Sequence, residues 1–254
     1  MMLDLSPILL LGQGFLETGF VIFLRVGGLM AVLPAFGEQF LSARIKLVLS
    51  FAFTLVVAPA VAAPVQAVGG GAIILGEALI GLALGVGIRF FVLALQVAGT
   101  IAAQATSLSQ LFGGTSGEPQ PAVGHLLTTA GLALAVMAGL HVQVAALIIA
   151  SYDVLPPGQL PDAEALRAWG VSGVTRTFGL AFSIAAPFVL AGLVYNVALG
   201  VINRAMPQLM VSFVGAPALT LGGLALLAIA VPSGLVHWHA SFTTFLNDAF
   251  GGAW

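Results

Sequence analysis

The sequence predicts an all-α integral membrane protein. Of its 254 residues, 60% are hydrophobic and only 6% are charged, and the mean hydropathy is +1.14. A soluble domain carries about 25% charged residues, so this composition excludes one. Helices satisfy their own backbone hydrogen bonds in lipid, and each spanning helix needs about 20 mostly apolar residues. The runs of that kind predict about six long apolar helices.

The first half of the chain holds three of these runs. They cover residues 8–36, 47–63 and 72–105. A polar bridge at 37–46 separates the first two, and three consecutive glycines at 69–71 precede the third. Glycine and short polar segments favour breaks between helices, so we expect three separate helices here.

The second half begins with a fourth apolar run at 126–151. Residues 152–176 follow and contain several acids and arginines, which predicts an aqueous loop. Two more apolar runs, at 180–202 and 211–236, carry no charge.

A polar break separates the last two runs and predicts a tight turn between two membrane-length helices. Pro207 has no N–H to donate and disfavours helix at this point. Arg204 would lie at the end of the incoming helix, where a cation suits the helix dipole. The amides of Asn203 and Gln208 can satisfy backbone groups left free at the turn. A plain solvated hairpin would also fit these residues.

Four ionisable residues lie within the apolar runs: Glu17, Arg25, Glu77 and Arg89. A charge at membrane depth costs about 3 kcal/mol or more unless it is paired or hydrated, so each is a candidate functional residue. Glu17 and Arg25 are a little over two helical turns apart and lean to roughly one side of their helix. Glu77 could instead be an anion favoured near a helix start. Arg89 could extend to the interface or pair with a neighbouring helix.

Small residues recur at helical spacing and predict close helix packing. Gly81 and Gly85 are one helical turn apart, as are Ala218 and Gly222. Helices in lipid associate through small residues that let their backbones approach. The partner helix could belong to this chain or to another subunit, and each helix has more than one face.

The sequence offers little for catalysis, cofactors or metal ions. It has no cysteine, hence no disulfide and no thiolate site, and its scattered charges form no basic patch for nucleic acid. Its histidines lack the further ligands that a metal site needs. His237 and His239 flank Trp238 and are predicted to be interfacial, with the indole as an anchor. We therefore expect a non-enzymatic protein without a cofactor.

The polar break also carries a resemblance. NRAMPQLMVSFVGAP resembles the signature of the FliR family, export-gate subunits of flagellar type III secretion systems related to the SctT proteins of virulence systems. The matching residues in this block are Asn203, Arg204, Pro207, Gln208, Gly215 and Pro217. Two earlier blocks resemble the same family, through Arg25, Pro34, Phe36, Gly37 and Lys46, and through Glu77, Gly81 and Gly85.

The resemblance implies a fold, a location and partners. It implies one export-gate domain over residues 1–254, with a FliP-like part at about 1–168 and a FliQ-like helical hairpin at about 169–254. It implies a multi-pass protein of the bacterial inner membrane, in the flagellar basal body. The partners it implies are FliP, FliQ, FlhB, FlhA, unfolded flagellar export substrates and membrane lipid.

The stretch at residues 110–124, QLFGGTSGEPQPAVG, is the most irregular part of the sequence. Irregular backbone at membrane depth survives only inside protein or against a water-filled cavity, although an exposed connector would also fit. Apolar side chains on a flexible loop can seal a pore by excluding water, and the resemblance favours such a plug. The predicted plug residues are Leu111, Phe112, Gly113, Gly114 and Gly117.

The leading hypothesis is a structural and gating subunit of the flagellar type III protein export channel. The alternative is a small-solute or ion-coupled secondary transporter that uses the four ionisable residues of the apolar runs. Inverted repeats would favour a transporter, and the sequence contains no evident repeat.

Overall fold

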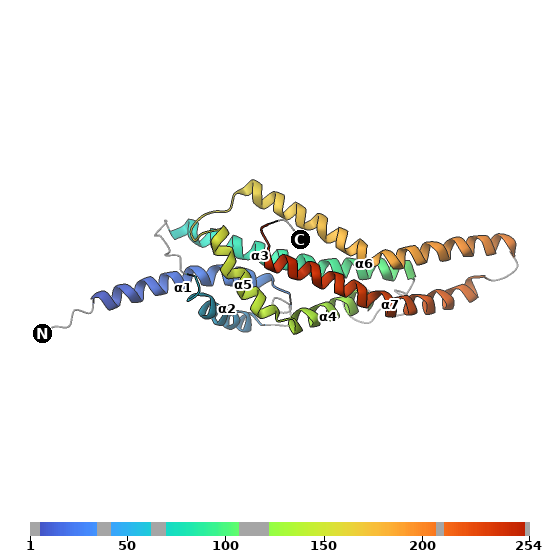
Figure 1. The fold of residues 1–254 in the computed structure, drawn as a ribbon, viewed down its shortest axis with the longest axis horizontal. Helices are drawn as coiled ribbons and strands as arrows, with labels where there is room; N and C mark the ends of the chain where they lie inside the picture. The colour runs from blue at the N-terminus through green and yellow to red at the C-terminus, as the bar shows by residue number, and fades with distance from the viewer. Residues whose placement is uncertain (1–5, 35–41, 62–69, 107–121, 207–210, 252–254) are drawn as a thin grey trace. The chain divides into compact units, whose positions relative to one another are not determined.

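The computed structural model describes residues 6–34, 42–61, 70–106, 122–206 and 211–251. Within these residues the chain forms seven helices and no strand (Figure 1), which confirms the all-α prediction. The helices are α1 (Ser6–Val32), α2 (Ala43–Val57), α3 (Gly70–Thr106), α4 (Ala122–Met137), α5 (Leu140–Val154), α6 (Ala163–Ala205) and α7 (Val211–Asn247).

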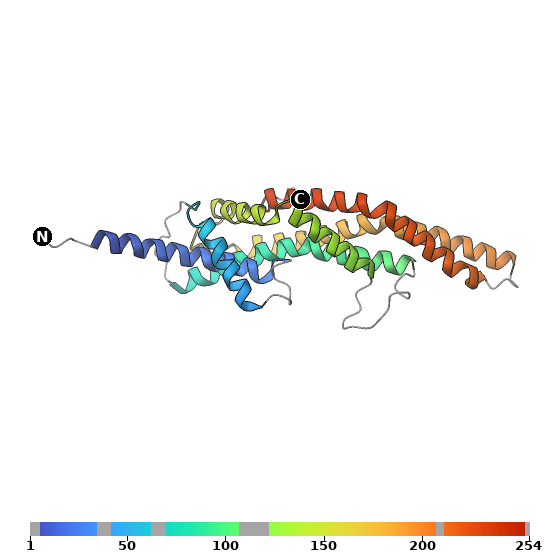
Figure 2. The same cartoon turned by 90° about the horizontal axis from the view of Figure 1, so that it is seen from below.

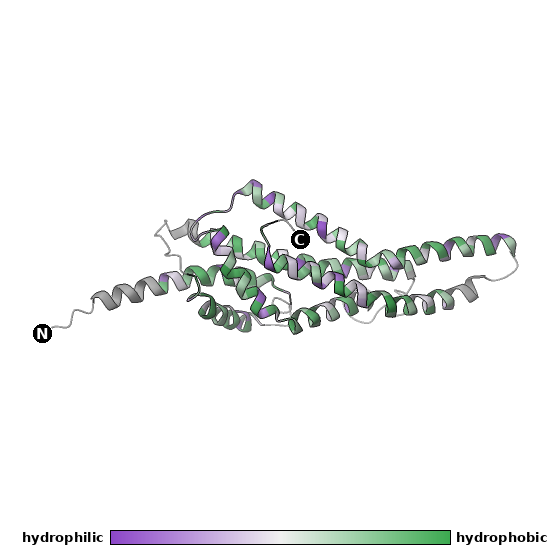
Figure 3. Cartoon of the chain, in the orientation of Figure 1, coloured by the Kyte–Doolittle hydropathy of each residue, from purple (hydrophilic) through white to green (hydrophobic). Residues whose placement is uncertain are grey.

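Three described helices are long and apolar enough to cross a membrane. They are α3 from Ile74 to Ala105, the whole of α6, and α7 from Pro217 to Asn247. A fourth span results if α4 and α5 together form one broken span. Figure 3 shows that hydrophobic residues dominate α3, α4 and the second half of α6. The chain is therefore a multi-pass membrane protein, with fewer candidate spans than the six apolar helices expected from the sequence.

Helix breaks and helix lengths account for the difference. The run at 126–151 is divided between α4 and α5 because Gly139 adopts a left-handed conformation with φ 81°, which glycine tolerates best. The amide of Val142 then donates to the carbonyl of Gly139 and opens the first turn of α5. Helix α2 has only 15 residues, fewer than the ~20 that a span requires.

The aqueous loop predicted at 152–176 is mostly helical instead. Helix α5 continues to Val154 and α6 begins at Ala163, so only residues 155–162 lack helix. Asp162 caps α6, because its carboxylate accepts a hydrogen bond of 2.8 Å from the amide of Ala165. Glu164 lies in the first turn, where the helix dipole favours an anion, and pairs with Arg167 on the exposed face. The charges thus mark a solvated helix surface.

Part of the polar break predicted to form a turn between the last two runs belongs to helix α6. Helix α6 continues through Asn203 and carries Arg204 in its last turn, as expected, and α7 begins at Val211. The backbone of the intervening residues 207–210 lies outside the described part of the chain.

The chain divides into two compact units. The first unit comprises Met1–Arg89, Gly139–Val171 and Thr244–Trp254. Its core is formed by apolar side chains of α1, α3 and α5, among them Leu29, Leu84 and Ile148.

Helices α1 and α3 meet through glycine in the first unit. A Cβ at Gly81 would overlap the carbonyl oxygen of Arg25, and one at Gly85 would lie 2.8 Å from that of Leu29. The backbones therefore touch at these positions. For Gly81 and Gly85, the partner helix suggested by the small-residue spacing belongs to this chain.

The second unit comprises Phe90–Ala138 and Ser172–Thr243. Within it, α6 and α7 run side by side as an antiparallel pair (Figures 1 and 2). Trp238 is 1% exposed, stacks on Phe242 and donates a hydrogen bond of 2.8 Å to the carbonyl of Phe91. The prediction that Trp238 is an interfacial anchor is therefore wrong. The indole N–H finds a backbone acceptor inside the protein, which permits its burial.

Candidate functional site

The candidate functional site is a cluster of polar groups buried in the first unit around Arg25 and Glu77. Both side chains are 0% exposed. Arg25 belongs to α1, on the side that also buries Val26 and Leu29. Glu77 belongs to α3, one turn before Gly81. Because Gly81 lets the two backbones touch, the two charged side chains lie within reach of each other.

The two side chains form a bidentate ion pair. Nε of Arg25 donates to Oε2 of Glu77 at 2.7 Å, and a terminal nitrogen of Arg25 donates to Oε1 at 3.2 Å. Paired parallel N–H···O bonds of this kind are among the strongest hydrogen bonds in proteins and also fix orientation.

The remaining donors of Arg25 bind the end of α5. One terminal nitrogen donates to the hydroxyl of Ser151 and the other to the carbonyl of Leu155, each at 2.9 Å. The hydroxyl of Ser151 in turn donates to the carbonyl of Ile148. The guanidinium also lies 3.7 Å from the ring centroid of Tyr152, in cation–π contact.

Glu77 accepts further hydrogen bonds from the same region. The amide of Gly158 donates to Oε1 at 3.2 Å, and the hydroxyl of Tyr152 approaches Oε2 at 3.4 Å. Gly158 has φ 82°, a left-handed conformation that aims its amide at the carboxylate. The cluster therefore joins α1, α3, α5 and the connection that follows α5.

This geometry makes the cluster a structural connection. Taking two charges out of water is costly, and the cost is offset only when both ions are paired and their other donors and acceptors are satisfied. Arg25 and Glu77 meet that condition. Since they satisfy each other in a closed interior, neither is presented to a substrate.

The structure brings together two of the four ionisable residues singled out in the apolar runs. Arg25 pairs with Glu77 rather than lying with Glu17, which is exposed on α1. Arg89 is exposed on α3. Glu77 is not a helix-start anion, because α3 begins two turns earlier at Gly70 and the dipole effect fades within the first turn.

The other predicted family residues lie apart from this cluster or outside the described residues. Pro34 is buried after α1, and Lys46 is half-buried in α2. Asn203, Arg204 and Pro217 are exposed, and Gly215 belongs to α7. The predicted residues that lie outside the described part are Phe36, Gly37, Leu111, Phe112, Gly113, Gly114, Gly117, Pro207 and Gln208.

The residues that the structure describes form no arrangement suited to binding a metal ion. No group of three or more histidine, aspartate or glutamate side chains there is arranged to hold a metal ion. Glu77, the acidic side chain that is fully buried among the described residues, is already bound to Arg25.

The candidate spans and the buried ion pair place the chain in a general class, the multi-pass helical membrane proteins with a buried charge cluster. Comparison with known proteins narrows the class. Residues 16–245 match the family of bacterial export proteins, family 1. The chain therefore belongs to this family, the FliR family, as its sequence motifs suggested, and is a non-enzymatic membrane component of bacterial export.

The relatives are flagellar proteins. The chain is 32% identical to the flagellar biosynthetic protein FliR of Caulobacter vibrioides, over 89% of this chain and 93% of the relative. It is 28% identical to FliR of Escherichia coli over 82% of each chain. It is 24% identical to FliR of Bacillus subtilis, over 78% of this chain and 79% of the relative.

Proposed function

We propose that this chain is a structural and gating subunit of the flagellar type III protein export channel in the bacterial inner membrane. Together with FliP and FliQ it would form the gate that unfolded flagellar substrates cross, with FlhB and FlhA close by. The similarity to flagellar FliR proteins over most of the chain supports a place in the flagellar export apparatus.

The exposed apolar surface of α6 and α7 is the observation that supports the proposal most directly. In their most apolar segments, only 33% of α6 and 11% of α7 is buried within this chain. Phe178, Leu190 and Val194 of α6 and Leu221 and Ile229 of α7 are exposed. Such surfaces must be covered by lipid or by other subunits.

Glycines with unoccupied space beside them indicate that other subunits, rather than lipid alone, cover these helices. A Cβ at Gly179, Gly200 or Gly222 would meet nothing within 4 Å. Small residues in membrane helices allow another helix to approach closely. At these three positions, none of the helices that the structure describes comes within 4 Å of the added Cβ. Gly81 and Gly85 differ, because their approaching helix is α1.

The proposal also includes a FliQ-like hairpin and a plug. The FliQ-like hairpin expected at about 169–254 would begin inside α6 and include α7. The plug would be formed by the loop that contains Leu111 and Phe112, which lie outside the described residues. Both features rest on the family resemblance and on the apolar and flexible character of the sequence.

A secondary transporter is less well supported. It would need ionisable groups that exchange partners as an ion or proton passes. Arg25 and Glu77 are instead bound to each other and to Ser151, Leu155 and Gly158 in a closed cluster.

Co-expression with FliP and FliQ, followed by purification in mild detergent, tests the proposal. We expect one discrete complex that contains all three chains. Gly200→Leu should lower the yield of the complex, because a side chain would obstruct the open surface of α6. Gly170→Leu, at an equally open position near the start of α6, is the matched control. Recovery of this chain alone in every preparation would refute the proposal.

A further inference from the structure

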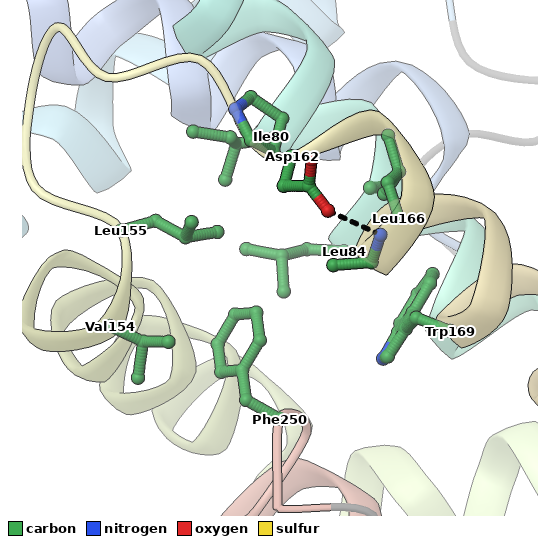
Figure 4. Close-up of a pocket in the computed structure, with 11 residues that line it drawn as sticks. Ile80, Leu84, Val154, Leu155, Asp162, Leu166, Trp169 and Phe250 are labelled. Atoms are coloured by element: carbon green, nitrogen blue, oxygen red, sulfur yellow. Dashed lines mark hydrogen bonds between the residues drawn. The ribbon is translucent and has the colours of Figure 1, made fainter.

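An apolar cavity opens in the first unit (Figure 4). It is linked to the Arg25–Glu77 cluster through Leu155, which lines the cavity and whose carbonyl accepts a hydrogen bond from Arg25. Its volume is about 260 Å³. Helix α3, the end of α5, the start of α6 and the segment after α7 form its walls. Among the described residues of the lining, Asp162 has the one charged side chain. The others are apolar residues such as Leu84, Val154, Leu166, Trp169 and Phe250.

The volume fits a single bulky side chain. A cavity of about 150 Å³ lined by leucine, isoleucine and phenylalanine is large enough to hold benzene. Sites for whole small molecules and cofactors usually measure about 300–1,000 Å³. At about 260 Å³ this cavity lies between the two. It admits a large aliphatic or aromatic group and is too small for the two acyl chains of a lipid.

The walls are held in place before any partner arrives. Nε1 of Trp169 donates a hydrogen bond of 3.0 Å to the carbonyl of Ala249. The indole ring also rests on α3, where a Cβ at Gly87 would lie 2.9 Å from it. On the other side, Arg25 holds the carbonyl of Leu155 at 2.9 Å. A preformed pocket binds without the cost of ordering its own walls.

The mouth of the cavity favours a cation. Asp162 is exposed, and its hydrogen bond from Ala165 uses only part of the acceptor capacity of a carboxylate. Arg25 does not neutralise it, because that guanidinium is committed to Glu77. Trp169 is half-buried at the same cavity (Figure 4), and an indole face attracts cations.

We propose that this cavity is a docking site for a partner polypeptide segment in which a bulky apolar side chain stands next to a lysine or arginine. The apolar side chain enters the cavity, and its basic neighbour faces Asp162. An aminophospholipid would offer the same combination of an apolar chain and an ammonium group. The volume favours the polypeptide. This proposal goes beyond the gating role and does not depend on it.

Photo-crosslinking to the purified full-length chain in detergent tests the docking site. The probe is a short peptide that places photo-leucine directly before lysine, and a matched peptide carries glutamate instead of the lysine. Mass spectrometry identifies the labelled residues. We expect the lysine peptide to label the cavity wall, at positions such as Leu84 and Leu166, and the glutamate peptide to label it less.

Two variants and one control make the test specific. Asp162→Asn removes the charge but keeps a good helix-capping residue, and should weaken labelling about two- to fivefold, as expected for a partly exposed ion pair. Ala83→Phe should abolish labelling by filling the cavity. Asp153→Asn removes an exposed charge outside the lining and should change nothing.

Three results would overturn the docking proposal. One is equal labelling by the lysine and glutamate peptides. Another is labelling that Asp162→Asn leaves unchanged while the variant chain remains folded. The third is labelling of the same wall by a photoreactive phosphatidylethanolamine that the lysine peptide does not displace. None of these results would bear on co-purification with FliP and FliQ, so the two proposals fail separately.

Discussion

At the scale of single residues, Arg25 and Glu77 explain why a membrane protein with few charges encloses two of them. Each ion is 0% exposed and bound to the other and to backbone atoms of the segment after α5. The pair thereby fixes residues that are distant in sequence. An apolar pair could fill the same space, but it could not bind the carbonyl of Leu155 or the amide of Gly158.

Removing one partner should destabilise the protein strongly. In Glu77→Gln, the guanidinium of Arg25 would remain buried without a counter-ion, and we expect a loss of about 3–5 kcal/mol of unfolding free energy. Denaturant titration of the purified chain in detergent measures the loss. Glu17→Gln is the control, because Glu17 is exposed on α1 and should tolerate the change.

Replacing both partners should lower the unfolding free energy by less than the sum of the losses from the two single replacements. We expect Arg25→Met combined with Glu77→Leu to leave no unpaired ion, so that the double-mutant cycle yields a coupling energy within the range of about 0.5–3 kcal/mol. The same denaturant titration supplies all four values. Strict additivity would mean that the two charges do not stabilise each other.

The sequence identified these two residues but not their pairing. Arg25 and Glu77 stand out because each interrupts an apolar run. Their sequence separation of 52 hides the contact, and the nearer Glu17 attracts attention because it lies in the same helix as Arg25. Opposite charges in two apolar helices were a signal that could have suggested the pair. Ser151 and Gly158 carried no such signal.

At the scale of elements, the contact between α1 and α3 depends on glycine. Gly81→Ala should weaken this contact, because its Cβ would overlap the carbonyl oxygen of Arg25 and the backbones would have to separate. We expect a lower midpoint of thermal denaturation in detergent. Gly27→Ala on α1 is the matched control, since nothing lies within 4 Å of the added Cβ and alanine favours helix by up to about 1 kcal/mol.

The predicted elements differ from the observed ones where local chemistry decides. Charged residues at 152–176 suggested a loop, but the cap at Asp162 and the Glu164–Arg167 pair support the start of α6. The apolar run at 126–151 suggested one helix, but Gly139 divides it. Hydropathy reports how apolar a segment is, whereas a cap or one left-handed glycine sets where a helix begins or ends.

The plug hypothesis predicts a leak. Deleting residues 113–117 removes three of the five predicted plug residues and shortens the segment that contains Leu111 and Phe112. If these apolar side chains exclude water from the pore, the complex with FliP and FliQ should conduct ions more readily when idle. Planar-bilayer recordings measure the conductance, and Thr115→Ala is the control within the same segment. Unchanged conductance of an intact complex would contradict the plug.

At the scale of the whole molecule, the composition and the bare helices lead to one interpretation. The chain has only 6% charged residues, and the two ions that are fully buried among the described residues, Arg25 and Glu77, are bound to each other. A buried pair of this kind is not free to exchange partners as coupled transport requires. Its long helices expose apolar faces and open glycines. We expect other membrane subunits to cover these faces in an assembly. The family motifs of the sequence suggested such an assembly, whereas its composition did not.

Transport by reconstituted vesicles tests this account most directly. Vesicles that contain only this chain should translocate neither small solutes nor unfolded flagellar substrate. We expect the chain to insert into these vesicles and to remain inactive, because the proposed channel also requires FliP and FliQ. If the isolated chain moved solute or polypeptide across the membrane by itself, the account would be contradicted and the secondary-transporter alternative would take its place.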